Sequence, residues 1–112
     1  MNLSYKIVAL LMIILGAAHQ AFAVADGRFN LNVLWFVGSG FAIIFAGFLN
    51  VVFLRIEPKD PFVRAVCFTA NLTVTSLFAV AYFTVLDEPQ VIIGTLLFAS
   101  ATVFSLLLKS KS

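Results

Sequence analysis

The chain has 112 residues, of which 62% are hydrophobic and 11% charged, with a mean hydropathy of +1.11. Soluble domains average about 45–50% apolar and about 25% charged residues, so the composition predicts an integral membrane protein and argues against a soluble domain. The net charge of +2 arises from seven basic and five acidic residues without a basic run, which argues against nucleic-acid binding. The short length predicts a single transmembrane domain over residues 1–112.

The first apolar segment covers about residues 5–25, and Lys6 at its start is its only charge. We expect this segment to remain as the first membrane helix, since about 20 apolar residues can cross a hydrocarbon core of about 30 Å. The alternative is a cleavable signal peptide, because a basic start and an apolar run are followed by Ala-x-Ala at residues 21–23 and 23–25. Cleavage would leave three helices and an external N-terminus.

The second segment covers about residues 31–54 and contains no charged residue. As a helix it is expected to be about 36 Å long, which is enough to cross a bilayer with some tilt. Three small residues and one amide recur in it at every fourth position: Gly38, Ala42, Ala46 and Asn50. Because small residues let another helix approach closely, the sequence predicts this face as the central packing surface.

The third segment covers about residues 62–86 and the fourth about residues 89–108. Pro89 lies at the predicted start of the fourth helix, where a missing backbone N–H costs nothing. The connections are short, so consecutive helices should be antiparallel neighbours. The predicted fold class is all-α: an integral membrane four-helix bundle with up-down-up-down order. Asn71 of the third segment should reach the depth of Asn50 and bond with it between helices.

The basic residues are distributed unequally over the two sides of the predicted bundle. Of the seven, only Arg28 falls on the side opposite the termini, together with Asp26, Asp87 and Glu88. Lys and Arg are enriched in cytoplasmic loops. We therefore expect a multi-pass protein of the bacterial inner membrane with both termini in the cytoplasm.

His19 is the only ionisable side chain well inside a predicted span. Such groups tend to face the bundle interior, and depth matching places Ser39 and Thr95 near His19, so these three residues form the candidate intramembrane polar site. The imidazole is either a structural group hydrogen-bonded between helices, or a proton relay, a hydrogen-bond donor to a quinone or lipid headgroup, or a haem or metal ligand. The spans contain no second His and no carboxylate, so a metal site lacks ligands, and we expect no metal and no cofactor.

The chain contains no nucleophile elbow, phosphate loop or metalloprotease helix motif, so we expect no catalytic residues and no enzymatic activity. Three short patterns lie in its first half: Gly16-x-x-His19, Trp35-Phe36-x-Gly38-x-Gly40 and Gly47-x-x-Asn50. Their combination resembles a family of uncharacterised small four-helix proteins of the bacterial inner membrane. The resemblance implies a membrane four-helix fold and no particular activity.

These observations together favour a non-enzymatic accessory or lipid-associated membrane subunit. Its expected partners are the lipid bilayer and either a larger membrane complex or further copies of the chain. One alternative is a small-solute or proton-coupled transporter that uses His19. A further alternative is a quinone-associated membrane anchor.

Overall fold

In the computed structural model, the described residues of the chain form four α-helices: α1 (Asn2–Val24), α2 (Leu31–Arg55), α3 (Pro61–Thr84) and α4 (Pro89–Leu107). The structure describes residues 2–25, 27, 29–84 and 89–110, without the side chain of Gln90. Consecutive helices run antiparallel, so the expected all-α membrane four-helix bundle with up-down order is confirmed. Asp26, Arg28, Asp87, Glu88 and Lys111, which entered the charge argument, lie outside the described residues.

Local capping explains where α2 and α3 begin. The Asn30 side chain accepts a hydrogen bond from the Val33 N–H at 3.0 Å, which satisfies a donor that the first turn of a helix leaves open. The Asp60 carboxylate does the same for α3, accepting from the Phe62 N–H at 2.7 Å. Pro61 then takes the first helical position, where a missing N–H costs nothing.

Length and composition make this a multi-pass membrane protein. α1, α2 and α3 have 23, 25 and 24 residues and are apolar enough to cross a bilayer. The molecule measures 51 Å along its longest axis, which exceeds the roughly 40–45 Å of a bilayer with its headgroups. α4 is shorter, with 19 residues, and its crossing stays a prediction.

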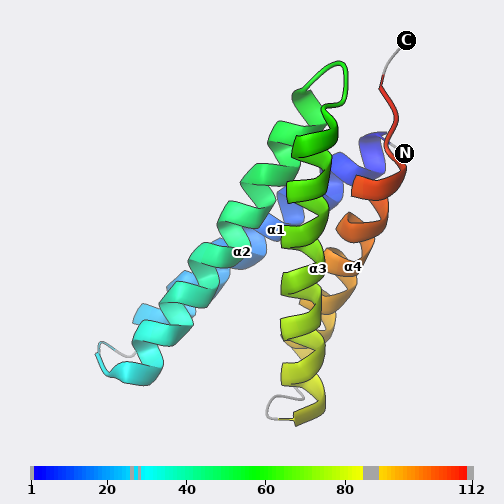
Figure 1. Cartoon of the computed structure of the whole chain (residues 1–112). Coiled ribbons are helices and arrows are strands. Elements are labelled where there is room, and N and C mark those ends of the chain that lie inside the picture. The colour runs from blue at the N-terminus through cyan, green and yellow to red at the C-terminus, as the bar shows by residue number, and fades with distance from the viewer. Residues whose placement is uncertain (1, 26, 28, 85–88, 111–112) are drawn as a thin grey trace.

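The helices form two hairpins that meet at one end and diverge at the other. The start of α1, the end of α4 and the α2–α3 connection lie together at what we call the termini end, whereas at the opposite end the α1–α2 pair of helices lies apart from the α3–α4 pair (Figure 1). The shared core begins at the termini end, where Tyr5 of α1 and Phe53 of α2 are fully buried, and it extends to Phe98 at the middle of α4. The core thus joins the two hairpins near one membrane surface.

The packing face of α2 differs from the one expected. Ala46 and Asn50 are buried, but Gly38 and Ala42 are exposed, and a Cβ added at Gly38 would meet nothing within 4 Å. The buried row is Gly40, Ile43, Ala46, Gly47, Asn50 and Phe53. A strict i, i+4 repeat rotates by about 40° at each step of an α-helix, so the four expected positions spread over about 120°. The buried row covers an arc of similar width, about 140° at about 100° per residue, but its centre is rotated by about 70° toward Gly40, Ile43 and Gly47.

Candidate functional site

Four polar side chains meet in the shared core at the termini end. They are Tyr5 from α1, Asn50 from α2, and Cys67 and Asn71 from α3, and each is 0% exposed. We call these residues the polar cluster. Uncharged polar groups can be buried in a membrane protein when they hydrogen-bond one another, so their partners decide what the cluster can do.

Asn50 is the centre of the cluster. Its Nδ2 donates to Oδ1 of Asn71 at 2.7 Å, and Nδ2 of Asn71 donates back to Oδ1 of Asn50 at 2.8 Å. The same Asn50 oxygen accepts from the Tyr5 hydroxyl and from the Cys67 thiol, the latter at 3.2 Å. Its second Nδ2 hydrogen goes to the Ala46 carbonyl at 2.7 Å. Every donor and acceptor of the Asn50 amide is therefore used inside the protein.

Helical geometry and ring packing position the other members. Cys67 and Asn71 are four residues apart on α3 and so lie on one face of that helix. The Tyr5 ring stacks on Phe104 of α4 with centroids 5.4 Å apart, and it tilts against Phe53 of α2 at 6.4 Å. All four helices thus contribute to the surroundings of the Tyr5 side chain.

The cluster can hold helices together but has little capacity for chemistry. It contains no carboxylate, imidazole or amine, and the Tyr5 hydroxyl and the Cys67 thiol, whose oxygen and sulfur lie 3.5 Å apart, both donate to Oδ1 of Asn50. General acid–base catalysis needs a group free to exchange a proton with a substrate. The geometry instead indicates a closed network that fixes the relative positions of α1, α2 and α3.

His19 lies away from this cluster, in the α1–α2 hairpin. Its imidazole stacks on the Phe36 ring, with centroids 3.5 Å apart and planes inclined by 10°. The neighbouring Gln20 donates from Nε2 to the Val37 carbonyl at 3.0 Å and lies against Gly40, where an added Cβ would come within 2.6 Å of the Gln20 amide. Nε2 of His19 and Oε1 of Gln20 are buried without a hydrogen-bond partner in the described part of the chain.

No hydrogen bond joins His19, Ser39 and Thr95 to one another in the described part of the chain. The Ser39 hydroxyl is exposed and donates to its own helix, to the Trp35 carbonyl at 3.0 Å. The Thr95 hydroxyl donates to the Val91 carbonyl at 2.8 Å. Thr95 belongs to the other hairpin, and the two hairpins are separated toward the end where these residues lie (Figure 1). The contact expected between Thr95 and His19 is missing because the hairpins diverge. The Ser39 and Thr95 hydroxyls instead bond the carbonyl four residues earlier, as hydroxyls in membrane helices readily do.

Two cations at the termini end act as caps of helix C-termini. Nζ of Lys59 donates to the carbonyls of residues 53, 54 and 56 at 2.8–2.9 Å, and it pairs with Glu57 at 2.9 Å. The Arg64 guanidinium donates to the carbonyls of residues 105, 106 and 108 at the end of α4. Positive charge is favourable at the C-terminal end of a helix. Both side chains also lie over the Phe53 ring, at 5.5 and 5.0 Å from its centroid.

Sequence reasoning missed the roles of Tyr5 and Cys67. The only available signal for Cys67 is its position four residues before Asn71, which places both on one helix face. Nothing local to Tyr5 indicates that its hydroxyl contacts Asn50, because that contact depends on how α1 crosses α2.

The described residues contain no group of three or more His, Cys, Asp or Glu side chains arranged to hold a metal ion. The candidate sites among the described residues are therefore the closed polar cluster, the unpartnered polar atoms of His19 and Gln20, and the basic residues at the termini end. Comparison of this chain with protein families, with curated proteins and with solved structures finds no match.

Proposed function

We propose that the protein is a non-enzymatic accessory subunit of the bacterial inner membrane, which binds laterally to a larger membrane complex or to a second copy of itself. One observation carries this proposal: an exposed face of small residues along α3. Its members are Ala65, Thr69, Thr73 and Ser76, and all four are exposed. We call this surface the α3 small face.

The hydroxyls of the α3 small face are already satisfied within the helix. Those of Thr69, Thr73 and Ser76 donate to carbonyls four residues earlier, at 2.7–2.9 Å. The face therefore needs no polar ligand, and its low profile lets a second helix approach closely, which is how membrane helices associate. In support, Cys67 and Asn71 are the only buried residues among those of α3, so this helix has ample surface for a further neighbour.

Purification from native membranes in mild detergent, followed by native mass spectrometry, tests this assignment. We expect the chain to be recovered with another membrane protein or as a homo-oligomer. Ser76→Leu should weaken that association because the added side chain separates the helices. Ser39→Leu is the matched control, since Ser39 is also exposed and also bonds its own helix. A monomer carrying only lipid, or equal effects of both substitutions, would contradict the proposal.

We also propose that the termini end faces the cytoplasm. The described basic residues Lys6, Arg55, Lys59, Arg64 and Lys109 support this orientation, because each lies at or near the termini end of its helix or in the adjoining segment. Reporter fusions after residue 110 and within residues 55–61 should report the cytoplasm, and fusions within residues 25–30 should report the outside. An external signal after residue 110 would refute the orientation.

Retention of α1 belongs to the same proposal. Tyr5, Ala9 and Met12 of α1 are fully buried, so cleavage after residue 23 or 25 would remove part of the shared core. N-terminal sequencing of the purified protein should start at the beginning of α1. A mature N-terminus at Val24 or just after Ala25 would show instead that this segment is a signal peptide.

The unpartnered atoms of His19 and Gln20 favour a second candidate function, a small-solute or proton-coupled carrier. Buried polar atoms without partners require an explanation, and a transported proton or a small hydrogen-bonding solute would supply one. Under this alternative, a pH-dependent flux in liposomes should disappear in His19→Ala. Flux that is absent from the wild type, or unchanged in the variant, would eliminate the carrier.

A further inference from the structure

Lys6 and Arg55, two basic side chains at the termini end, have no partner among the described residues, unlike the two basic side chains that cap helices. Lys59 and Arg64 are bound to carbonyl oxygens. Lys6 of α1 and Arg55 of α2 are exposed and make no hydrogen bond or ion pair within the described part of the chain. Because Lys59 already takes the carbonyls at the end of α2, Arg55 is not needed there as a cap.

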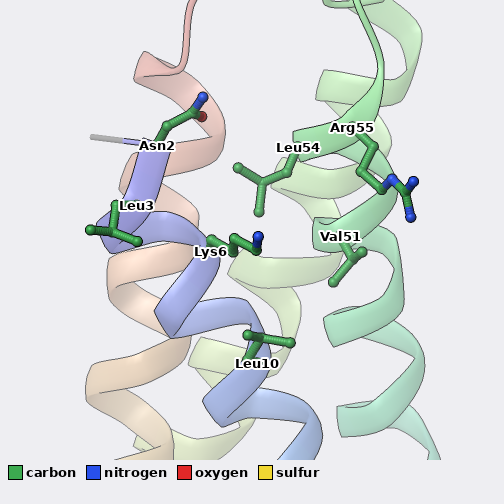
Figure 2. Close-up of a pocket in the computed structure, with 7 residues that line it drawn as sticks. All are labelled: Asn2, Leu3, Lys6, Leu10, Val51, Leu54 and Arg55. Atoms are coloured by element: carbon green, nitrogen blue, oxygen red, sulfur yellow. The ribbon is translucent and has the colours of Figure 1, made fainter.

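The two free cations lie on opposite walls of one groove. A cavity of about 570 Å³ lies between α1 and α2 at the termini end, and Lys6, Leu10, Val51, Leu54 and Arg55 are among its lining residues. Figure 2 shows Lys6 extending from α1 into the space between the helices, while Arg55 stands on the α2 side with its guanidinium turned away from Lys6. The groove is therefore cationic at its rim and apolar below.

No described carboxylate neutralises these cations. Glu57 pairs with Lys59 at 2.9 Å, and the Asp60 carboxylate caps the first turn of α3. The other three acidic residues of the sequence lie outside the described residues. An anion that enters the groove thus meets two positive charges that no described carboxylate compensates.

We propose that this groove binds an anionic phospholipid, with its phosphate at the rim beside Lys6 and an acyl chain along Leu10 and Val51. Rotation of the exposed Arg55 side chain brings its guanidinium to the same phosphate. Arg55 is the last residue of α2 and Lys6 lies in the second turn of α1. Their long side chains can extend toward the membrane interface, which places both charges near the depth of the lipid headgroups. Basic pockets between membrane helices favour anionic headgroups. A zwitterionic lipid brings its own cation, which Lys6 and Arg55 repel. Lipid binding at this groove rests on the proposed position of the chain in the membrane, and it needs no partner protein.

The test is lipid binding by the full chain in mild detergent. Phosphatidylglycerol, phosphatidylcholine or inorganic phosphate is titrated in, and bound lipid is measured by native mass spectrometry. Lys6→Gln and Arg55→Gln should each weaken phosphatidylglycerol binding about fivefold, and the double variant about 25-fold. Lys109→Gln, an exposed cation at the same end but outside the groove, should leave binding unchanged. Phosphatidylcholine should bind weakly, and added salt should weaken phosphatidylglycerol binding.

Several results would overturn the proposal. Unchanged phosphatidylglycerol binding in the double variant, or an equal loss in Lys109→Gln, would show that binding reflects general surface charge. Equal binding of phosphatidylcholine would remove the role of the cations. Saturation by inorganic phosphate that blocks the lipid would make this a phosphate site. Partner recovery through the α3 small face is a separate readout, so failure of one proposal is distinguishable from failure of the other.

Discussion

Removal of the central amide of the polar cluster should destabilise the protein strongly. Asn50→Ala eliminates the two reciprocal hydrogen bonds with Asn71 and those from Tyr5 and Cys67. Interhelical hydrogen bonds in membrane proteins average about 0.6 kcal/mol each, so the four together contribute about 2 kcal/mol. The change also leaves the Asn71 amide and the Tyr5 hydroxyl buried with weaker partners, which costs up to about 3 kcal/mol more. We expect a loss of about 2–5 kcal/mol.

The assay is reversible unfolding in mixed micelles, where a denaturing detergent is titrated against helicity. Asn32→Ala is the matched control, because Asn32 lies on the same helix but is exposed and makes no hydrogen bond in the described part of the chain. Its effect on the free energy of unfolding should stay within about 0.5 kcal/mol. Tyr5→Phe should cost only about 0.6–1.7 kcal/mol, since Oδ1 of Asn50 keeps its bonds from Asn71 and Cys67.

A double-mutant cycle with Asn71→Ala makes the reasoning refutable. If the two amides form one interaction, the second substitution should cost less in the presence of the first, because its main partner is already gone. Strictly additive losses would mean that Asn50 and Asn71 do not bond each other in the membrane. A loss for Asn50→Ala no larger than that for Asn32→Ala would show that the cluster does not hold the hairpins together.

The remaining predictions concern packing and capping. Gly16→Ala should lower thermal stability, since the new Cβ would lie 2.5 Å from an Ile44 side-chain atom and 3.1 Å from a carbonyl oxygen. Gly38→Ala should be neutral or stabilising by up to about 1 kcal/mol. Equal effects of the two substitutions would refute the observed packing face of α2. Ala46→Leu should destabilise the protein by about 1–3 kcal/mol and Phe48→Leu by less, because Ala46 is 6% and Phe48 49% exposed. The same shift in melting temperature for both variants would contradict the assignment of Ala46 to the packed face and Phe48 to the lipid-facing one. Arg64→Lys keeps the charge but not the forked donors, so hydrogen exchange in the last turn of α4 should accelerate, and unchanged exchange would remove the capping role.

The sequence by itself determines where the helices lie and how they follow one another. A polar or charged group in the hydrocarbon region is unfavourable residue by residue, so the uncharged run at residues 31–54 marks a span without reference to any other part of the chain. Asp60 followed by Pro61 specifies a helix start through local hydrogen bonds. Short connections then require antiparallel neighbours, which is why the bundle topology could be predicted.

The tertiary structure alone decides which faces meet. In a bilayer both the packed and the lipid-facing sides of a helix are apolar, so hydrophobicity does not distinguish Gly38, which is exposed, from Gly47, which is buried. The choice depends on the shape of two helix surfaces and on their crossing, and neither is encoded within one segment. The same crossing brings the Tyr5 hydroxyl to Asn50, a residue 45 positions away, and the divergence of the hairpins separates His19 from Thr95. Segment positions are local properties of this sequence, whereas its polar cluster and its cationic groove exist only after the helices have packed.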